Sequence, residues 1–211
     1  MRCNPDHQWS ACATSPAPCP VSMPHNSGRN SPPSGHLELV SEVAGRLAAL
    51  GLQPVLVGGM ALVMLGSRRV TRDFDFVIAS PGEQLAGVLD VFYDRGLELA
   101  AKLNDAGDVT ATIGNRRIAA ARLRMDQPDS AFFYNRESGL RIDVLFDFPV
   151  PARELSERSV PARTVAGVLR VASEPDLLKL KQTAQSRRSL AADAQDIAFL
   201  EARRQAPSRG K

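Results

Sequence analysis

The segment RDFDFVIAS, residues 72–80, places two carboxylates in an otherwise apolar run. Its alternation of polar and apolar residues predicts a β-strand, in which side chains at i and i+2 share one face. Asp73 and Asp75 then lie together on one face, and the phenylalanines between them face the core. Two such carboxylates repel each other and resist burial. Either they lie on a solvated edge of a sheet, or a cation lies between them.

A third carboxylate stands on a later segment, RIDVLFD, residues 141–147. This segment also alternates, with Asp143 opposite the apolar side chains, and Pro149 ends it. If the two strands pair, Asp143 completes a set of three carboxylates with Asp73 and Asp75. Oxygen ligands of this kind suit Mg²⁺ or Mn²⁺ rather than zinc. Asp147 shares the face of Asp143, but its place at the end of the strand predicts a solvated turn residue.

A glycine pair precedes the first two aspartates in the stretch QPVLVGGMALVMLGS. The pattern predicts a short buried strand, a turn at Gly58-Gly59 and a helix of about two turns that ends at Gly66. Glycines at such a turn let backbone N–H groups come close to phosphate oxygens. Phosphate-binding glycines beside metal-binding carboxylates favour phosphoryl or nucleotidyl transfer, in which a carboxylate can deprotonate the attacking hydroxyl.

Each of these features also has a plainer interpretation. A Gly-Gly pair is often only a turn, and a D-x-D segment is often a solvated strand edge. It is their combination, in this order and spacing, that favours the catalytic interpretation.

The elements that would position these residues form a mixed order along the chain. We predict helices over 34–51 and after Pro81, strands and turns over 108–135, a strand over 139–149, a short helix and a hairpin over 152–173, and two helices over 173–204 that separate near 187–189. This order indicates a small mixed β-sheet flanked by helices, with a helical segment at the C-terminus. The α+β and α/β classes both remain open.

Composition sets the wider frame. The chain has 211 residues, 44% of them hydrophobic and 23% charged, which is typical of a globular protein. Residues 1–35 are rich in Pro, Ser, Asn and Gly and are predicted to be a disordered tail, followed by a core over 36–150 and a C-terminal helical extension over 151–204. The three cysteines lie in the tail without the spacing of a disulfide framework or a zinc site.

No apolar run reaches the roughly 20 residues of a membrane helix, and the first 30 residues lack a secretory pattern. We therefore expect a cytoplasmic protein. The net charge of +3 and the pI near 9.0 permit a nucleic-acid partner without implying one.

The stretch GGMALVMLGSRRVTRDFDFVI, residues 58–78, resembles the signature of the nucleotidyltransferase superfamily, whose fold is shared with DNA polymerase beta. In that superfamily a glycine pair opens a helix, D-x-D follows on the next strand, and a third acid lies on a later strand. The run from Arg69 to Asp75 is similar to the R-x-[ST]-x-D-x-D run of the bacterial AbiEii and MenT toxins. The resemblance extends over about residues 37–204, although only the order of elements matches over 80–138.

The resemblance implies a Mg²⁺- or Mn²⁺-dependent enzyme that transfers NMP from an NTP to an acceptor and releases pyrophosphate. It implies a toxin–antitoxin or phage-defence protein, with RNA such as a tRNA end, or a protein, as acceptor and a cognate antitoxin as partner. Three alternatives stay open: a small-molecule (antibiotic) nucleotidyltransferase, a non-catalytic nucleotide-binding protein of the same fold, and a metal site that is only structural.

The resemblance also reaches the C-terminal helices, where it implies that Lys181 faces the nucleotide phosphates. Alternatively, Lys179 and Lys181 only flank an apolar stripe. If the C-terminal helix pair folds back over the cleft, removal of Lys181 should weaken NTP binding by about 1.5–3 kcal/mol. Stability should stay nearly unchanged, because an exposed lysine contributes little to folding. Asp193 and Asp196 are expected to cap this helix pair or to form salt bridges within it, a structural rather than a catalytic role.

Arg69 and Thr71 precede the carboxylates and complete the predicted nucleotide-binding set with Gly58, Gly59 and Lys181. The guanidinium of Arg69 suits phosphate oxygens, or it forms an ion pair with an acidic neighbour. Thr71 is expected to satisfy backbone groups at the start of the strand.

Overall fold

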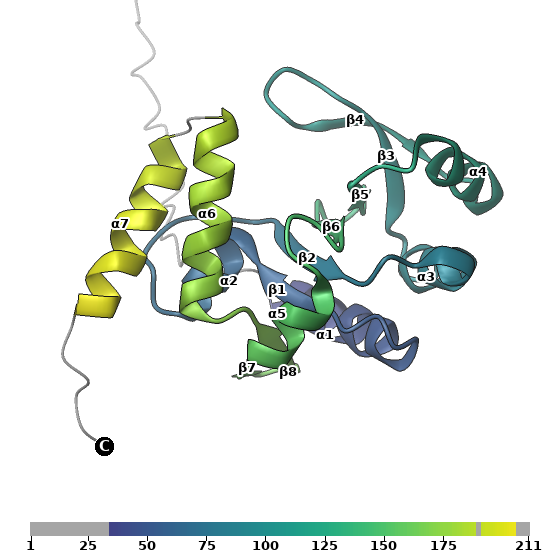
Figure 1. The fold of residues 1–211 in the computed structure, drawn as a ribbon. Coiled ribbons are helices and arrows are strands. Elements are labelled where there is room, and N and C mark those ends of the chain that lie inside the picture. The colour runs from purple at the N-terminus through teal and green to yellow at the C-terminus, as the bar shows by residue number, and fades with distance from the viewer. Residues whose placement is uncertain (1–33, 189–190, 206–211) are drawn as a thin grey trace, which may run out of the picture.

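The computed structural model describes residues 34–188 and 191–205, so residues 1–33 of the predicted tail, with its three cysteines, lie outside the described residues, and residues 34 and 35 belong to the first helix. Eight strands of the described chain form one mixed sheet (Figure 1). They are β1 (Val55–Val57), β2 (Phe74–Ile78), β3 (Glu98–Leu103), β4 (Val109–Ile113), β5 (Ser130–Tyr134), β6 (Arg141–Phe146), β7 (Val160–Thr164) and β8 (Gly167–Val171). Their order across the sheet is β4-β3-β5-β6-β2-β1-β8-β7. The pairs β2–β6 and β1–β8 are parallel, and the other pairs are antiparallel.

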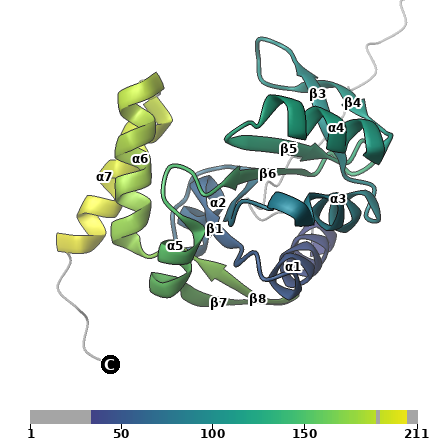
Figure 2. The same ribbon diagram turned by 45° about the vertical axis from the view of Figure 1, so that its right-hand side comes forward.

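Seven α-helices of the described chain flank this sheet. They are α1 (Ser34–Ala49), α2 (Gly58–Met64), α3 (Leu85–Tyr93), α4 (Arg116–Asp126), α5 (Ala152–Arg158), α6 (Glu174–Arg188) and α7 (Ala191–Gln205). Helices α6 and α7 stand side by side at one end of the molecule, and α1, α3 and α4 lie at the other (Figure 2). None of the helices over the described residues combines the length and the apolar character needed to cross a membrane.

The core forms where the apolar faces of the central strands meet the helices. Phe74 and Phe76 of β2 are at most 1% exposed, as their alternation with the aspartates predicts. Phe92 of α3 stacks on Phe133 of β5, with ring centroids 3.8 Å apart. These contacts hold β2, β5 and β6 against the α1–α3–α4 side and leave the opposite face of β2 toward α6.

The sequence predictions are confirmed for most elements and are wrong over 108–135. That segment was expected to hold only strands and turns, but it contains the helix α4. The side chain of Asn115 caps this helix by accepting hydrogen bonds from the backbone N–H groups of Arg117 and Ile118. Because only Ala119 and Leu123 of the helix are buried, its apolar face is too narrow to show a helical period in the sequence.

The predicted hairpin around Gly167 is present as β7 and β8. It lies in the segment predicted to be a helical extension, yet β8 pairs with β1 and the hairpin thereby extends the main sheet. The sheet therefore continues past residue 150, and only α6 and α7 remain as candidates for a separate helical unit. The resulting architecture is the mixed sheet with flanking helices that the order of elements predicted.

Candidate active site

The parallel register of β2 and β6 brings two of the predicted carboxylates together. Asp75 pairs directly with Asp143, so their side chains leave the same face of the sheet. Asp73 lies one residue before β2 and points to that face by the same alternation. The predicted pairing of these two strands is confirmed.

The glycine pair packs directly against Asp75. Gly58 has φ of 65°, in the left-handed region that favours glycine. A Cβ at this position would lie 1.9 Å from Oδ2 of Asp75. Glycine is therefore required here by both backbone conformation and space. The N–H of Gly59 donates a hydrogen bond to the Asp75 carboxylate, so in this structure that amide is directed at the carboxylate.

The environment of Asp75 disfavours the negatively charged form of its carboxyl group. Burial raises the pKa of this carboxyl, and the negative charge of Asp73 raises it further. The positive charges of Lys181 and Arg141 and the N–H of Gly59 act in the opposite direction without reversing the effect. The charged form of Asp75 is therefore disfavoured, chiefly by burial.

Asp143 has a partner that the sequence analysis did not assign. Nε and Nη2 of Arg141 donate to its two carboxylate oxygens at 2.7 and 2.8 Å. Asp143 is only 8% exposed, and burial raises the pKa of its carboxyl to about 7. The hydrogen bonds from Arg141 lower this pKa, whereas the charges of Asp75 and Asp73 raise it.

The three carboxylates do not form a ready coordination site. Over the described residues, no three acidic, histidine or cysteine side chains are grouped so that they could hold a metal ion. The prediction that Asp73, Asp75 and Asp143 already cluster is therefore not met, and both oxygens of Asp143 instead accept hydrogen bonds from Arg141. The donors still fit Mg²⁺ or Mn²⁺ in type, because they are oxygens only and carry negative charge that a divalent cation would neutralise.

Lys181 reaches the site from α6 but is not the exposed lysine that was expected. It is 8% exposed, and its Nζ lies 2.7 Å from Oδ2 of Asp196 and 3.1 Å from Oδ1 of Asp193. Both aspartates belong to α7, so the predicted salt bridges within this helix pair are confirmed. The expectation that Lys181 is exposed is wrong, and with it the reason for expecting stability to stay nearly unchanged on its removal, since it contacts two buried carboxylates.

Arg69 connects the loop before β2 to the same network. Its Nη1 forms an ion pair with Oδ2 of Asp196, the atom that also contacts Lys181. Of the two interpretations of Arg69, the structure shows the ion pair, although its acidic partner is distant in sequence. Its guanidinium also lies against Gly59, where an added Cβ would be 2.9 Å from Cζ of Arg69 and 3.1 Å from Oγ1 of Thr71. Thr71 thus packs on the glycine turn.

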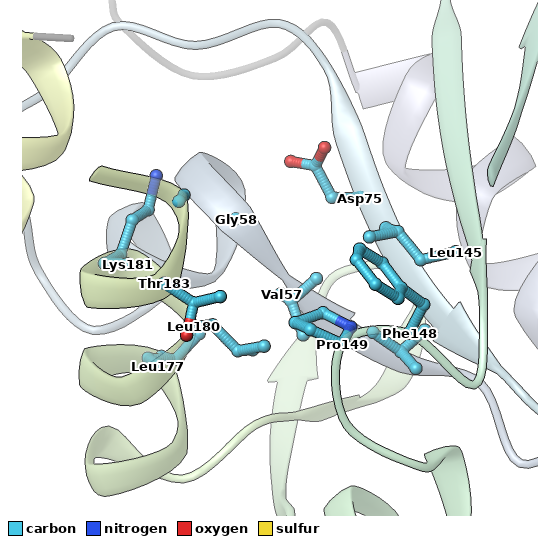
Figure 3. Close-up of a pocket in the computed structure, with 12 residues that line it drawn as sticks. Val57, Gly58, Asp75, Leu145, Phe148, Pro149, Leu177, Leu180, Lys181 and Thr183 are labelled. Carbon is cyan, nitrogen blue, oxygen red and sulfur yellow. The ribbon is translucent and has the colours of Figure 1, made fainter. Parts of the chain in front are cut away.

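A cavity of about 280 Å³ opens between the sheet and α6. Figure 3 shows Lys181 and Thr183 on α6 across this cavity from Gly58 and Asp75. Apolar side chains form most of the remaining wall: Val57, Leu145, Phe148, Pro149, Leu177 and Leu180. The carboxylate of Asp75, the glycine turn at Gly58 and the ammonium of Lys181 thus meet at one end of an otherwise apolar cavity.

Comparison with known proteins assigns the chain to a protein family. The family model described as "Nucleotidyl transferase AbiEii toxin, Type IV TA system" matches residues 45–209. The chain belongs to this AbiEii nucleotidyltransferase family. It is accordingly a nucleotidyltransferase enzyme, as the D-x-D segment and glycine pair predicted. No curated protein matches the chain in sequence.

Several solved structures are similar to this AbiEii-family chain. The antibiotic-resistance factor ANT(2'')-Ia is 12% identical, with 81% of this chain and 84% of that chain covered and a TM-score of 0.51. An antigenic nucleotidyltransferase-like protein from Paracoccidioides brasiliensis is 18% identical, with coverages of 80% and 77% and a TM-score of 0.49. A putative nucleotidyltransferase from Thermotoga maritima is 12% identical, with coverages of 74% and 91% and a TM-score of 0.45. The likeness to ANT(2'')-Ia confirms the nucleotidyltransferase fold.

Asp147 of this AbiEii-family chain is more than a solvated turn residue. Its two oxygens accept hydrogen bonds from the backbone N–H groups of Ala152 at 2.8 Å and Ser80 at 2.7 Å. Its φ of 51° directs the chain from β6 toward α5. The expectation that solvent satisfies this carboxylate is wrong, since it ties the ends of β2 and β6 to the start of α5.

The sequence analysis did not predict the contact of Arg141 with Asp143 or that of Arg69 with Asp196. Arg141 had a usable signal, because it stands two residues before Asp143 on a predicted strand and therefore shares its face. The pair of Arg69 and Asp196 had none, since 127 residues separate them.

Proposed function

We propose that this nucleotidyltransferase uses Mg²⁺ or Mn²⁺ to transfer NMP from an NTP to RNA, such as a tRNA end, and acts as the toxin of a toxin–antitoxin pair. The observation that carries the proposal is the register that sets Asp75 beside Asp143, with Gly58 against Asp75 and Lys181 across the cavity. Family membership supports the transfer reaction and makes an antitoxin partner plausible.

Asp73, Asp75 and Asp143 would hold the cation. Once bound, the cation supplies electrostatic stabilisation and alignment of the triphosphate. The chain's own carboxylates then provide the proton acceptor. The acceptor hydroxyl oxygen bonds to the α-phosphorus, the bond from that phosphorus to the β-phosphate oxygen breaks, and pyrophosphate leaves with the electron pair. The hydroxyl proton passes to a site carboxylate.

Lys181 and Thr183 border the space on the opposite side of the cavity. An ammonium group has three N–H donors; that of Lys181 donates a hydrogen bond to Asp193 and forms an ion pair with Asp196. A third N–H can contact a phosphate oxygen, while the carboxylates of α7 keep the ammonium in place. Gly58 and Gly59 let the phosphates approach the backbone, and Arg69 and Thr71 hold that turn from behind.

RNA is favoured as acceptor by the net charge of +3 and the pI near 9.0. A protein acceptor is compatible with the same transfer chemistry. A small antibiotic is the second candidate, because ANT(2'')-Ia, whose fold is similar, is an antibiotic-resistance factor.

A transfer assay with each radiolabelled NTP would test these alternatives. The purified chain would be offered total tRNA, a mixture of cell proteins or aminoglycosides, in Mg²⁺, Mn²⁺ or EDTA. We expect label on tRNA with either cation and none in EDTA. Asp75→Asn and Asp143→Asn should abolish labelling, whereas Glu83→Gln, an exposed acidic residue beyond the far end of β2, should not. Labelling of an aminoglycoside alone would favour the antibiotic enzyme, and undiminished labelling in EDTA would refute the metal requirement.

A further inference from the structure

Among the described residues, Arg141 is the one arginine whose guanidinium donates two hydrogen bonds to a proposed metal ligand, Asp143. It is the first residue of β6 and covers both oxygens of Asp143 from the same face of the strand. Its charge also acts on Asp73 and Asp75, and all three carboxylates raise its own pKa although burial opposes this. The charge of Arg141 therefore acts on all three carboxylates, whereas that of Lys181 acts on Asp75.

The guanidinium is held by more than Asp143. Its Nη1 donates to the carbonyl oxygen of Gly107, in the turn between β3 and β4, at 3.1 Å. Its Cζ lies 4.6 Å from the ring centroid of Phe132, the β5 residue that pairs with Asp143. With its side chain only 19% exposed, Arg141 is fixed by an aromatic face, a carbonyl and a carboxylate. Such a set of contacts is specific to the fork geometry of arginine.

We propose that Arg141 is a positioning residue that occupies Asp143 in the cation-free enzyme and competes with the divalent cation for this carboxylate. The inference rests on the proposed function, in which Asp143 is a metal ligand. Both oxygens of Asp143 accept hydrogen bonds from Arg141, so a cation that binds this carboxylate meets a guanidinium already in contact with it. For a cation to bind Asp143, at least one of the two hydrogen bonds from the Arg141 guanidinium to the Asp143 carboxylate must then break.

The competition has a defined sign. In Arg141→Gln the carboxylates lose a positive charge and Asp143 loses its fork, so a cation should bind more tightly in the absence of nucleotide. We expect about a tenfold gain, the effect in water of removing one positive charge about 6 Å from a divalent cation. In Arg141→Lys the charge stays, but a point-like ammonium cannot cover both oxygens. Its affinity should lie between those of wild type and Arg141→Gln.

Arg158→Gln provides a matched control. Arg158 makes the same type of bidentate contact with Asp176, through Nε at 3.0 Å and Nη2 at 2.9 Å. This pair joins α5 to the start of α6 and involves none of the proposed metal ligands. The variant should lose stability through the broken pair and leave cation affinity unchanged.

The test measures Mn²⁺ binding by electron paramagnetic resonance on the full chain without nucleotide, after thermal unfolding has shown that each variant is folded. In parallel, Mg²⁺ is titrated into ¹⁵N-labelled wild type while the Nε–H resonance of Arg141, assigned from its loss in Arg141→Lys, is followed. The proposal expects tighter binding in Arg141→Gln than in Arg158→Gln and a Mg²⁺-dependent shift or loss of that resonance.

Two results would overturn the proposal, and they differ in what else they imply. If wild type binds cation but Arg141→Gln binds it equally or more weakly, Arg141 presents Asp143 to the cation instead of competing with it, and the proposed function stands. If neither wild type nor Arg141→Gln binds cation, with or without NTP, the metal-dependent function fails as well. Should Arg141→Gln not fold, Arg141→Lys and the wild-type resonance decide the same question.

Discussion

Lys181→Met is the substitution for which the structure makes the sharpest prediction. The variant keeps most of the apolar stem and removes the ammonium that lies between Asp193 and Asp196 of α7. Both carboxylates are buried, at 1% and 4% exposure, so solvent cannot replace the lost charge. Removing one partner of a buried ion pair costs about 3–5 kcal/mol. Arg69 still contacts Asp196, which places the expected loss toward the lower end of this range.

For a chain of this size, such a loss lowers the melting temperature by roughly 6–20 °C. Urea unfolding followed by circular dichroism, together with thermal scans, measures both quantities. Lys179→Met is the matched control, because Lys179 lies two residues earlier on the same helix and is exposed. Its stability should stay within about 0.5 kcal/mol of wild type.

The double variant Lys181→Met, Asp196→Asn separates lost charge balance from lost packing. If unbalanced carboxylates cause the destabilisation, removing one of them should restore part of the stability. NTP binding, measured well below the melting temperature, should weaken by about 1.5–3 kcal/mol if the third N–H of Lys181 contacts a phosphate. A stability loss below about 1 kcal/mol in Lys181→Met would refute the reasoning, since Lys181 would then be solvated in the folded protein.

Three further predictions concern the sheet face around Asp75. Gly58→Ala should unfold at a clearly lower temperature than Gly66→Ala. Both glycines have positive φ, but only at Gly58 would the added Cβ lie 1.9 Å from Oδ2 of Asp75. Equal melting temperatures would contradict the packing described. Asp75→Asn should abolish NMP transfer and, in EDTA, raise the melting temperature slightly. The reason is that the cost of burying its charge and the repulsion from Asp73 raise the pKa of Asp75, so the charged form destabilises the fold. A variant that melts at a lower temperature and still transfers NMP would exclude the assigned role.

The third prediction is a pH dependence. The pKa of Asp143 is about 7 in the folded protein and near 4 in the unfolded chain, so its stabilising contribution is full below pH 4 and is lost as the pH rises through 7. The melting temperature in EDTA should therefore fall from pH 5.5 to 8 in wild type, whereas an unchanged slope in Asp143→Asn would assign the effect to another group.

Local pattern predicted most of the elements and the identity of the carboxylates. Alternation along residues 72–80 determines that Asp75 leaves the strand opposite Phe74 and Phe76, and burial of the phenylalanines then directs the aspartate away from the core. The helix α4 escaped prediction because two buried residues do not produce a readable period. A search for caps would have found it, since Asn115 begins it and Gln127, in the left-handed region, ends it before Pro128.

Contacts between distant segments could not be predicted in the same way. Lys181 is a polar residue on a helix in sequence, and nothing local shows that two carboxylates of the next helix enclose it. The engagement of Asp143 by Arg141 follows strand alternation, but its strength depends on Phe132 and on the carbonyl of Gly107, which come from β5 and from the β3–β4 turn.

The amino-acid sequence by itself determined the chemistry available to this protein: a D-x-D strand, a glycine turn before it and a third aspartate on a strand of matching alternation. These are local features, set by the strand period of two and by the conformational freedom of glycine. Only the tertiary structure decided how the charges are balanced. It placed Phe132 and the carbonyl of Gly107 against Arg141 and buried Lys181 between Asp193 and Asp196. The electrostatic free energy of each group depends on burial and on neighbours that folding brings from distant parts of the chain.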